Sequence, residues 1–226
     1  FFTRAFDQIR MAAQANANIK LVGSYSGVSI GMDGQSQMGL EDLAMTRSLS
    51  SSVVLYPSDA YSMKSCMELA LKHEGLVYIR ATREPSSMIY TESNQFKLGG
   101  FTAFNSPAQS SVKATVISAG ITLHEALKAQ KTLSAESINI QVIDLYSIKP
   151  INFEELKAAI KSNRLVLVED HFPQGGLGEA VISGLINENY KFKHLAVKKQ
   201  PMSGLPAELL QYEEIGESAI IKAVKA

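Results

Sequence analysis

A regular alternation of helical and strand-forming segments constrains the fold of this chain more than any other feature. Over the first 80 residues, segments with apolar residues at helical spacing alternate with short runs suited to β-strands. The predicted helices lie at residues 1–16, 40–48 and 58–73, and the predicted strands lie at 18–22, 52–56 and 76–80. Because such an alternation places successive strands parallel in one sheet, we expect a mostly parallel sheet with helices on both faces.

The alternation returns after residue 112 and continues to the end of the chain. The predicted strands of this second part lie at 114–118, 138–145, 165–168 and 194–197, and the predicted helices at 123–133, 152–161, 179–186, 207–212 and 217–226. The sequence therefore predicts the α/β class, with two three-layer α/β/α units and mostly parallel sheets.

The stretch between the two parts breaks the pattern. Residues 81–111 are rich in Ser, Thr, Asn and Gly, which indicates a crossover between units. Short strands are predicted within it, near 88–90 and near 100–104. We expect the first unit with its crossover to span residues 1–95 and the second to span 96–226.

Composition argues against several classes of partner. The 226 residues include 22 Lys and Arg and 22 Asp and Glu, so the formal charge is zero, no long-range field would attract nucleic acid, and no run of like charge indicates a basic arm. No stretch approaches the roughly 20 apolar residues that span a bilayer. The single cysteine, Cys66, cannot form an internal disulfide, and its place on a predicted helix favours a buried, inert thiol. We expect a cytoplasmic protein with no nucleic-acid or membrane partner.

The chain opens on aromatic residues. Phe1, Phe2 and Phe6 would expose apolar surface that a complete domain normally covers. We favour the interpretation that the chain is a fragment of a longer protein. The alternative is that another chain or domain packs against its start.

The glycine-rich segment after the first predicted strand is the most informative candidate site. Residues 23–34 hold four glycines in twelve positions, which permits positive φ and close backbone approach. The segment lacks both the Gly-Lys-Ser/Thr ending of a P-loop and the Gly-x-Gly-x-x-Gly dinucleotide spacing. It does lie between a strand and a helix, where open α/β sheets bind ligands. Spacing alone leaves a functional site and a merely tight loop equally well supported.

Two arginines lie at the carboxyl end of the third predicted strand, one as its last residue and one three positions later. Arg80 and Arg83 could each bind a phosphate through a bidentate guanidinium. Position alone favours the alternative, an arginine that is solvated or paired with a carboxylate.

A second polar cluster lies at the end of a strand in the second part. Glu169, Asp170 and His171 combine carboxylates with a histidine, which suggests acid–base chemistry. A structural hydrogen-bond cluster that holds the loop is the favoured interpretation. The remaining histidines do not have the spacing of metal ligands, so no metal site is expected.

Taken in order, these segments resemble the transketolase family, and in particular its animal-like branch. The resemblance covers essentially the whole chain. The matching text includes Phe1-Phe2-Thr3-Arg4-Ala5-Phe6, Gly27-Val28-Ser29-Ile30-Gly31, Leu40-Glu41-Asp42-Leu43-Ala44-Met45, Tyr56-Pro57-Ser58-Asp59, Val168-Glu169-Asp170-His171 and Ser203-Gly204-Leu205-Pro206. It implies the later part of a thiamine-diphosphate pyrimidine-binding domain followed by a transketolase C-terminal domain.

The resemblance implies roles for five residues. Phe1 would pack on the aminopyrimidine ring of thiamine diphosphate, since a flat heteroaromatic ring prefers an aromatic wall, and Gln37 would line the cofactor site. Asp33 would accept a hydrogen bond from a sugar hydroxyl, and Arg83 would bind the sugar phosphate, which reverses the interpretation from position alone. Tyr25 stands where the animal enzymes have a substrate-contacting histidine. A phenol carries no positive charge near neutral pH, so the resemblance leaves the substrate preference open.

The resemblance also implies chemistry that this chain does not perform alone. The family's glutamate for the pyrimidine nitrogen would precede Phe1, and the Gly-Asp-Gly of its metal–diphosphate motif does not occur. No catalytic residue is therefore assigned in this chain, and the divalent cation (Mg or Ca) is expected on an N-terminal domain. The implied activity of the whole enzyme is transfer of a two-carbon ketol unit from a ketose phosphate to an aldose phosphate, in the pentose phosphate pathway. The chain alone is expected to be inactive.

Other functions stay open beside this one. A transketolase-like paralogue with a regulatory or structural role is one, and another thiamine-diphosphate enzyme, such as a deoxyxylulose-phosphate synthase or an oxo-acid dehydrogenase β subunit, is a second. The run Ser36-Gln37-Met38 favours transketolase over both enzymes. The implied partners are sugar-phosphate substrates, together with a second copy in a homodimer or an N-terminal transketolase domain.

Overall fold

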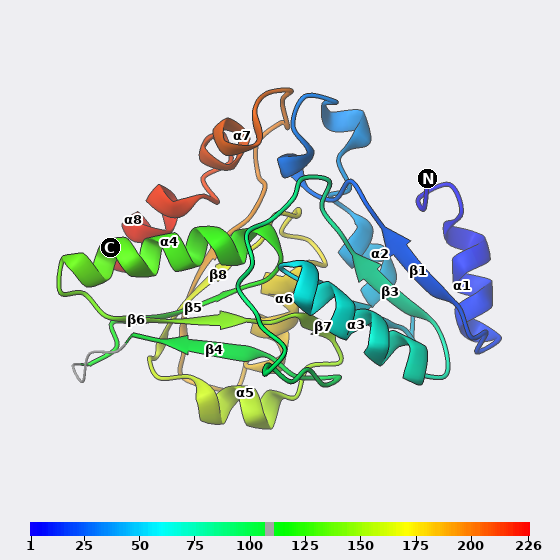
Figure 1. Ribbon diagram of the computed structural model, residues 1–226, viewed down its shortest axis with the longest axis horizontal. Helices are drawn as coiled ribbons and strands as arrows, with labels where there is room; N and C mark the ends of the chain where they lie inside the picture. The colour runs from blue at the N-terminus through cyan, green and yellow to red at the C-terminus, as the bar shows by residue number, and fades with distance from the viewer. Residues whose placement is uncertain (107–110) are drawn as a thin grey trace.

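The strands of this chain form two separate, mostly parallel sheets. The computed structural model describes residues 1–106 and 111–226, so positions 107–110 of the predicted crossover lie outside the described residues. Within the described part, one sheet has the order β1-β3-β2-β7 and the other has the order β4-β6-β5-β8-β9 (Figure 1). Helices flank both sheets, which confirms the predicted α/β fold class. None of the helices in the described ranges is long and apolar enough to cross a bilayer.

The first sheet follows the predicted alternation closely. Its parallel strands are β1 (Lys20–Gly23), β2 (Val53–Leu55) and β3 (Val77–Arg80), and its helices are α1 (Phe6–Gln14), α2 (Asp42–Arg47) and α3 (Ala60–Lys72). Helix α3 is capped at its start, because the Asp59 carboxylate accepts a hydrogen bond from the Ser62 amide at 2.8 Å. Strands β2 and β3 are buried along their whole length, which places their carboxyl ends at the centre of the molecule.

One strand of the first sheet was not predicted. Strand β7 (Ser147–Lys149) pairs antiparallel with β2, although it follows β6 (Ile140–Asp144) of the other sheet by only two residues. The run from 138 to 149 contains no glycine or proline, so the sequence offers no strong turn signal for a change of sheet. The two residues between β6 and β7 therefore link the carboxyl end of a strand in one sheet to an edge strand of the other.

The second sheet is covered on both faces. Its remaining strands are β4 (Thr102–Asn105), β5 (Ala114–Ser118), β8 (Arg164–Val168) and β9 (Lys191–Leu195), and its helices are α4 (Ile121–Ala135), α5 (Phe153–Ala159), α6 (Leu177–Gly184), α7 (Pro206–Tyr212) and α8 (Glu217–Lys225). Figure 1 shows α4 and α5 on opposite faces of this sheet. Strand β9 begins three residues before the predicted one, because its alternating lysines on a half-exposed edge hide it from a hydrophobicity pattern.

The strand predicted near 88–90 is wrong. The amides of Ile89 and Tyr90 donate to Oδ2 of Asp59, at 2.7 and 2.8 Å, so the donors that a strand ladder would use are taken by a carboxylate. The segment therefore runs as an extended connection across the start of α3.

Removal of the cap of α5 should destabilise the fold modestly. The Asn152 side chain accepts a hydrogen bond from the Glu155 amide at 3.2 Å. We expect Asn152→Ala to lower the free energy of unfolding by about 1 kcal/mol, measured by urea denaturation. Asn187→Ala, at an exposed position that caps no helix, serves as the control and should have little effect. Equal losses in the two variants would contradict the assignment.

Candidate functional site

The glycine-rich loop that follows β1 is closed on itself by backbone hydrogen bonds. Gly27 donates to the Gly39 carbonyl at 2.8 Å, and the Gly39 amide donates to the Tyr25 carbonyl at 3.0 Å. Between these contacts the chain makes two short 3₁₀ turns, η1 (Val28–Ile30) and η2 (Gln35–Gln37). The φ angle of Gly27 is 75°, in the left-handed region that favours glycine. The predicted conformational freedom is thus used, and the loop has one defined shape.

A cavity of about 620 Å³ opens beside this loop. Its lining includes three of the five predicted site residues: Phe1, Tyr25 and Gln37. The Phe1 side chain is almost fully exposed, and its ring meets Phe2 in a T-shaped contact with centroids 6.1 Å apart. The cavity therefore has an aromatic wall on one side and the polar loop on the other.

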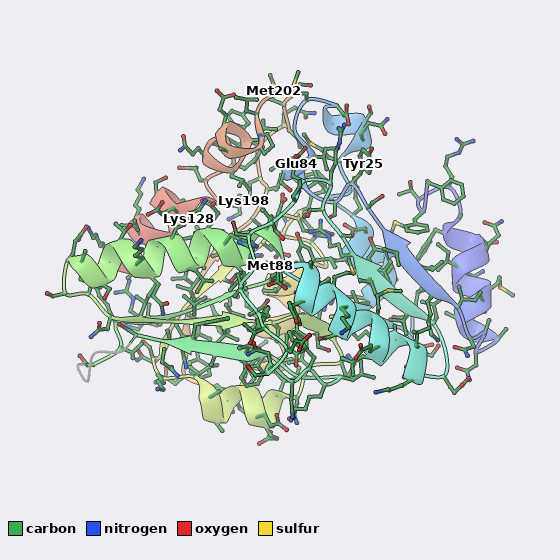
Figure 2. All side chains as sticks on the ribbon, in the orientation of Figure 1. Tyr25, Glu84, Met88, Lys128, Lys198 and Met202 are labelled. Carbon is green, nitrogen blue, oxygen red and sulfur yellow. The ribbon has the colours of Figure 1, made fainter. Side chains whose placement is uncertain are left out.

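The other two predicted residues lie next to the cavity. Asp33 and Arg83 form an ion pair, and the Arg83 guanidinium lies 5.3 Å from the centroid of the Tyr25 ring. Figure 2 shows Tyr25 where the loop leaves the carboxyl end of β1. Neither Asp33 nor Arg83 lines the 620 Å³ cavity, so Tyr25 is the residue that connects the pair to it. The structure thus brings all five positions into one neighbourhood, in two adjoining groups.

The backbone of Tyr25 is unusual for this residue type. Its φ angle is 63°, a region that residues other than glycine seldom adopt, and its side chain is partly exposed. Residues held in such conformations cluster at functional sites, where the surrounding structure fixes them. Here the hydrogen bond from the Gly39 amide to the Tyr25 carbonyl holds the backbone, and the contact with the Arg83 guanidinium holds the phenol ring.

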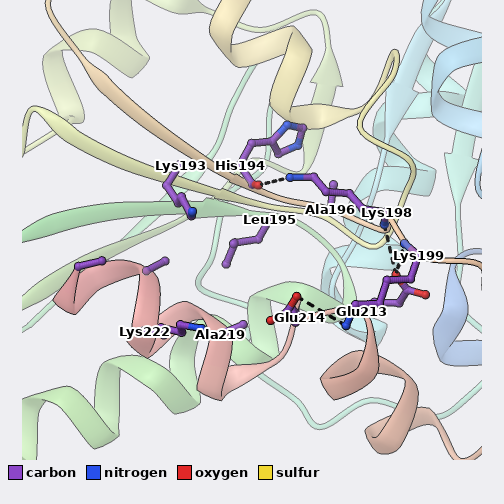
Figure 3. Close-up of a pocket in the computed structure, with 12 residues that line it drawn as sticks. Lys193, His194, Leu195, Ala196, Lys198, Lys199, Glu213, Glu214, Ala219 and Lys222 are labelled. Carbon is purple, nitrogen blue, oxygen red and sulfur yellow. Dashed lines mark hydrogen bonds and ion pairs between the residues drawn. The ribbon is translucent and has the colours of Figure 1, made fainter.

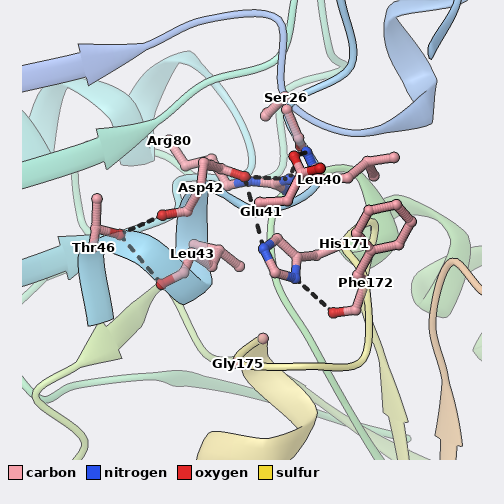
Figure 4. A network of polar contacts seen from close by, with 12 residues as sticks. Ser26, Leu40, Glu41, Asp42, Leu43, Thr46, Arg80, His171, Phe172 and Gly175 are labelled. Carbon is pink, nitrogen blue, oxygen red and sulfur yellow. Dashed lines mark hydrogen bonds and ion pairs between the residues drawn. The ribbon is translucent and has the colours of Figure 1, made fainter. Parts of the chain in front are cut away.

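A buried ion pair forms the floor beneath the cavity (Figure 4). Arg80 is fully buried and donates to both carboxylate oxygens of Asp42, at 2.8 and 3.2 Å. Tyr78 also donates its hydroxyl to Asp42, at 2.7 Å. Burial opposes ionisation of Asp42, but the charge and hydrogen bonds of Arg80, together with His171 and the Tyr78 hydroxyl, outweigh it and hold the pKa of the carboxyl below its ordinary value. Arg80 is therefore the carboxylate-paired arginine that position alone favoured, and it does not face the cavity.

Sequence reasoning did not assign Asp42 or Tyr78 to the site, although both line the cavity. Asp42 is the first residue of α2, where an acidic side chain is ordinary, and Tyr78 lies inside a buried strand. The hydrogen bonds from Tyr78 and Arg80 to Asp42 join residues 36 and 38 positions apart in the sequence, and no local pattern carries such a contact.

The Glu169–His171 cluster makes structural contacts. The Glu169 carboxylate accepts from the amides of Leu177 and Gly178, at 2.6 and 2.9 Å, and so satisfies the free donors at the start of α6. Its Oε1 also lies 2.6 Å from Nε2 of His194. Burial lowers the pKa of His171, whose Nδ1 lies 2.6 Å from the Phe172 carbonyl oxygen. The hydrogen-bond interpretation favoured by the sequence agrees with this geometry.

A second cavity, of about 240 Å³, lies between β9 and α8 (Figure 3). Its basic lining residues are Lys193, Lys198, Lys199, Lys222 and His194. Two of its ammonium groups are engaged within the protein, Lys198 with the His194 carbonyl at 2.9 Å and Lys199 with Glu214 at 3.6 Å. None of the predicted site residues lines it. Within the described ranges, no group of three or more His, Cys, Asp or Glu side chains could hold a metal ion.

Comparison with known families matches both parts of the chain. Residues 1–86 match the family model of the transketolase pyrimidine-binding domain. Residues 108–220 match that of the transketolase C-terminal domain. This chain belongs to the transketolase family. The predicted resemblance is confirmed, and the pyrimidine-binding domain implies thiamine diphosphate as the cofactor of the family.

Curated relatives match along the whole chain. Human transketolase is 47% identical over 228 residues, which covers all of this chain and 36% of the human protein. Mouse transketolase-like protein 2 is 46% identical with the same coverage, and bovine transketolase-like protein 1 is 44% identical over 38% of its length. The chain thus spans little more than a third of these relatives.

A solved structure described as a split gene transketolase, inactive beta4 tetramer, has the same fold. It superposes with a TM-score of 0.87 at 29% identity, over 98% of this chain and 71% of the other. The transketolase fold is therefore present in this chain.

Proposed function

We propose that this chain supplies the pyrimidine side and the sugar-phosphate side of a transketolase active site. The enzyme to which it contributes would transfer a two-carbon ketol unit from a ketose phosphate to an aldose phosphate. The observation that carries the proposal is the arrangement of Phe1, Tyr25 and Gln37 around one cavity, with the Asp33–Arg83 pair beside it. The domain ranges 1–95 and 96–226 belong to the same proposal.

The lining of the cavity fits the pyrimidine end of thiamine diphosphate. Phe1 offers an exposed aromatic face, and Phe2 is held behind it by Tyr78, with ring centroids 5.8 Å apart. Gln37 adds an amide that can donate and accept hydrogen bonds. When bound, the cofactor supplies an electron sink for cleavage of the carbon–carbon bond. The described residues do not fit a divalent cation, so we assign cation binding to other polypeptide.

The Asp33–Arg83 pair suits recognition of a phosphorylated sugar. Both side chains are about 40% exposed, and an ion pair at such a site contributes little stability. The guanidinium can therefore exchange its partner for a phosphate, which it binds in a bidentate fashion. Asp33 then becomes free to accept a hydrogen bond from a sugar hydroxyl. Tyr25 keeps the guanidinium in place by the cation–π contact but adds no charge of its own.

Assembly is part of the proposal. The solved neighbour is described as a tetramer of one kind of subunit and as inactive. We infer that this chain forms a homodimer or pairs with an N-terminal transketolase domain, in the cytoplasm, and that it is inactive alone. Light scattering that finds only a monomer at high concentration would contradict the homodimer.

A non-catalytic paralogue is the second candidate. Tyr25 favours it, because a neutral phenol stands where the animal enzymes have a histidine. The matches to transketolase-like proteins are nearly as close as those to transketolase itself, at 46% and 47% identity.

A coupled assay separates the two candidates. Xylulose 5-phosphate, ribose 5-phosphate, thiamine diphosphate and Mg²⁺ are supplied to this chain and to the complete product of its gene. We expect turnover by the complete product and none by the chain alone. In the complete product, Arg83→Ala should raise KM for ribose 5-phosphate by about 10- to 100-fold, because a charge-assisted contact is lost.

The matched control is Arg10→Ala, which removes an exposed arginine that pairs with Asp7 on α1. It should leave KM unchanged. Absence of turnover in the complete product would favour the paralogue, and an unchanged KM in Arg83→Ala would remove Arg83 from the phosphate site.

A further inference from the structure

A side chain from the second unit holds the loop that carries Tyr25 and Asp33. Asp170, which follows β8, extends to the first unit, where its Oδ1 accepts from the Val28 amide at 2.8 Å and its Oδ2 from the Ser29 amide at 3.5 Å. Both amides belong to η1, which lies between Tyr25 and Asp33 in the sequence. The shape of the loop therefore depends on a contact between residues 142 positions apart.

The glycines of the loop show how closely it fits this part of the chain. A Cβ added at Gly27 would lie 1.9 Å from Oδ2 of Asp170, and one added at Gly31 would lie 3.1 Å from the Gly204 carbonyl oxygen. Both glycines also have positive φ. The loop thus lies directly against the second unit at both glycines, and there is no room for a side chain at Gly27.

Asp170 is itself fixed and fully buried. Its carbonyl oxygen accepts from the buried Arg80 guanidinium at 2.9 Å, so the same residue contacts the buried floor of the cavity. A buried carboxylate is costly unless it receives hydrogen bonds. Its oxygens receive them from the η1 amides, so Asp170 loses this stabilisation when the loop moves.

We propose that Asp170 is a positioning residue, which holds η1 in the conformation that brings Tyr25 and Asp33 to Arg83. The second unit would in this way take part in sugar-phosphate binding, although none of its described residues lines the 620 Å³ cavity. The link to sugar phosphate rests on the proposed function, whereas the effect on the loop does not.

Hydrogen exchange in the 226-residue chain tests the effect on the loop. In Asp170→Ala, the Val28 and Ser29 amides should exchange at least about tenfold faster than in the unchanged chain, because both lose their acceptor. Asp170→Asn keeps an oxygen that can accept from Val28, so its exchange should stay near that of the unchanged chain.

The control is Ser58→Ala. It removes another buried contact between the units, the hydrogen bond from the Ser58 hydroxyl to Asp144 at 3.1 Å, which lies away from the loop. It should leave exchange at Val28 and Ser29 unchanged. Unchanged protection in Asp170→Ala, or equal acceleration in Ser58→Ala, would overturn the positioning role.

Kinetics of the complete gene product test the link to substrate. Asp170→Ala should raise KM for ribose 5-phosphate by about tenfold with kcat within about twofold, and Asp170→Asn should restore KM. If exchange in the loop increases while KM does not, the sugar-phosphate part is wrong and the loop contact stands. The exchange result decides the positioning role even if the complete product proves inactive.

Discussion

Replacement of Arg80 by methionine is expected to lower the free energy of unfolding by about 3–5 kcal/mol. Arg80 is fully buried, and its guanidinium lies 4.6 Å from the centroid of the Tyr56 ring. It donates to Asp42, to the Gly39 carbonyl and to the Asp170 carbonyl. Without it, the Asp42 carboxylate stays buried without the guanidinium charge, and the buried Asp170 carbonyl loses the hydrogen bond from Arg80.

Urea denaturation at neutral pH measures this loss. Arg10→Met is the matched control, since Arg10 is also paired with an aspartate but is exposed, and it should change stability by less than about 1 kcal/mol. The double variant Arg80→Met, Asp42→Asn should recover part of the loss, because it removes the stranded charge. A loss below about 1 kcal/mol in Arg80→Met would show that the pair does not stabilise the fold.

The overall fold could be predicted because its signals are local. Strands such as β5 and β8 are short apolar runs, and helices such as α3 begin at a capping residue that the sequence displays. The failures occur where a local signal is missing. Strand β7 has no glycine or proline in the segment before it, and the segment near Tyr90 donates its amides to a distant carboxylate.

The candidate site was predictable only in part, for a related reason. The glycines of the loop indicated an unusual backbone, and the family resemblance singled out residues such as Tyr25 and Arg83, which the structure brings into contact. The supporting contacts join residues far apart in the sequence, as Arg80 joins Asp42 and Asp170 joins Val28. Their partners depend on how the two sheets pack, and neither spacing nor composition reports that packing.

Asp144 should make the unfolding free energy fall as the pH rises from about 4 to about 7. The residue is fully buried where the two units meet, and it accepts from the Ser58 hydroxyl at 3.1 Å and from the Tyr90 hydroxyl at 2.6 Å. Burial raises the pKa of its carboxyl from 3.8 to about 7, although both hydrogen bonds act in the opposite direction.

The sign follows from the proton balance of Asp144. Between pH 4 and 7 the folded chain keeps the proton and the unfolded chain releases it, so raising the pH favours unfolding. Above pH 7 both states have lost the proton, and the dependence levels off. Each pKa unit corresponds to about 1.4 kcal/mol, so the full effect amounts to about 4 kcal/mol.

Asp144→Asn should remove this dependence, because the amide has the shape of the acid but does not titrate. Stability from urea denaturation at pH 5 minus that at pH 8 should be smaller in the variant than in the unchanged chain, by about 3 kcal/mol, because about two of the three pKa units fall within this range. Buried His171 contributes with the opposite sign, since its lowered pKa makes low pH favour the unfolded chain, but it is the same in both proteins and cancels in the comparison. Asp7→Asn, at an exposed carboxylate, controls for the change in net charge. If Asp144→Asn keeps the pH dependence of the unchanged chain, then Asp144 is not the group that takes up the proton on folding.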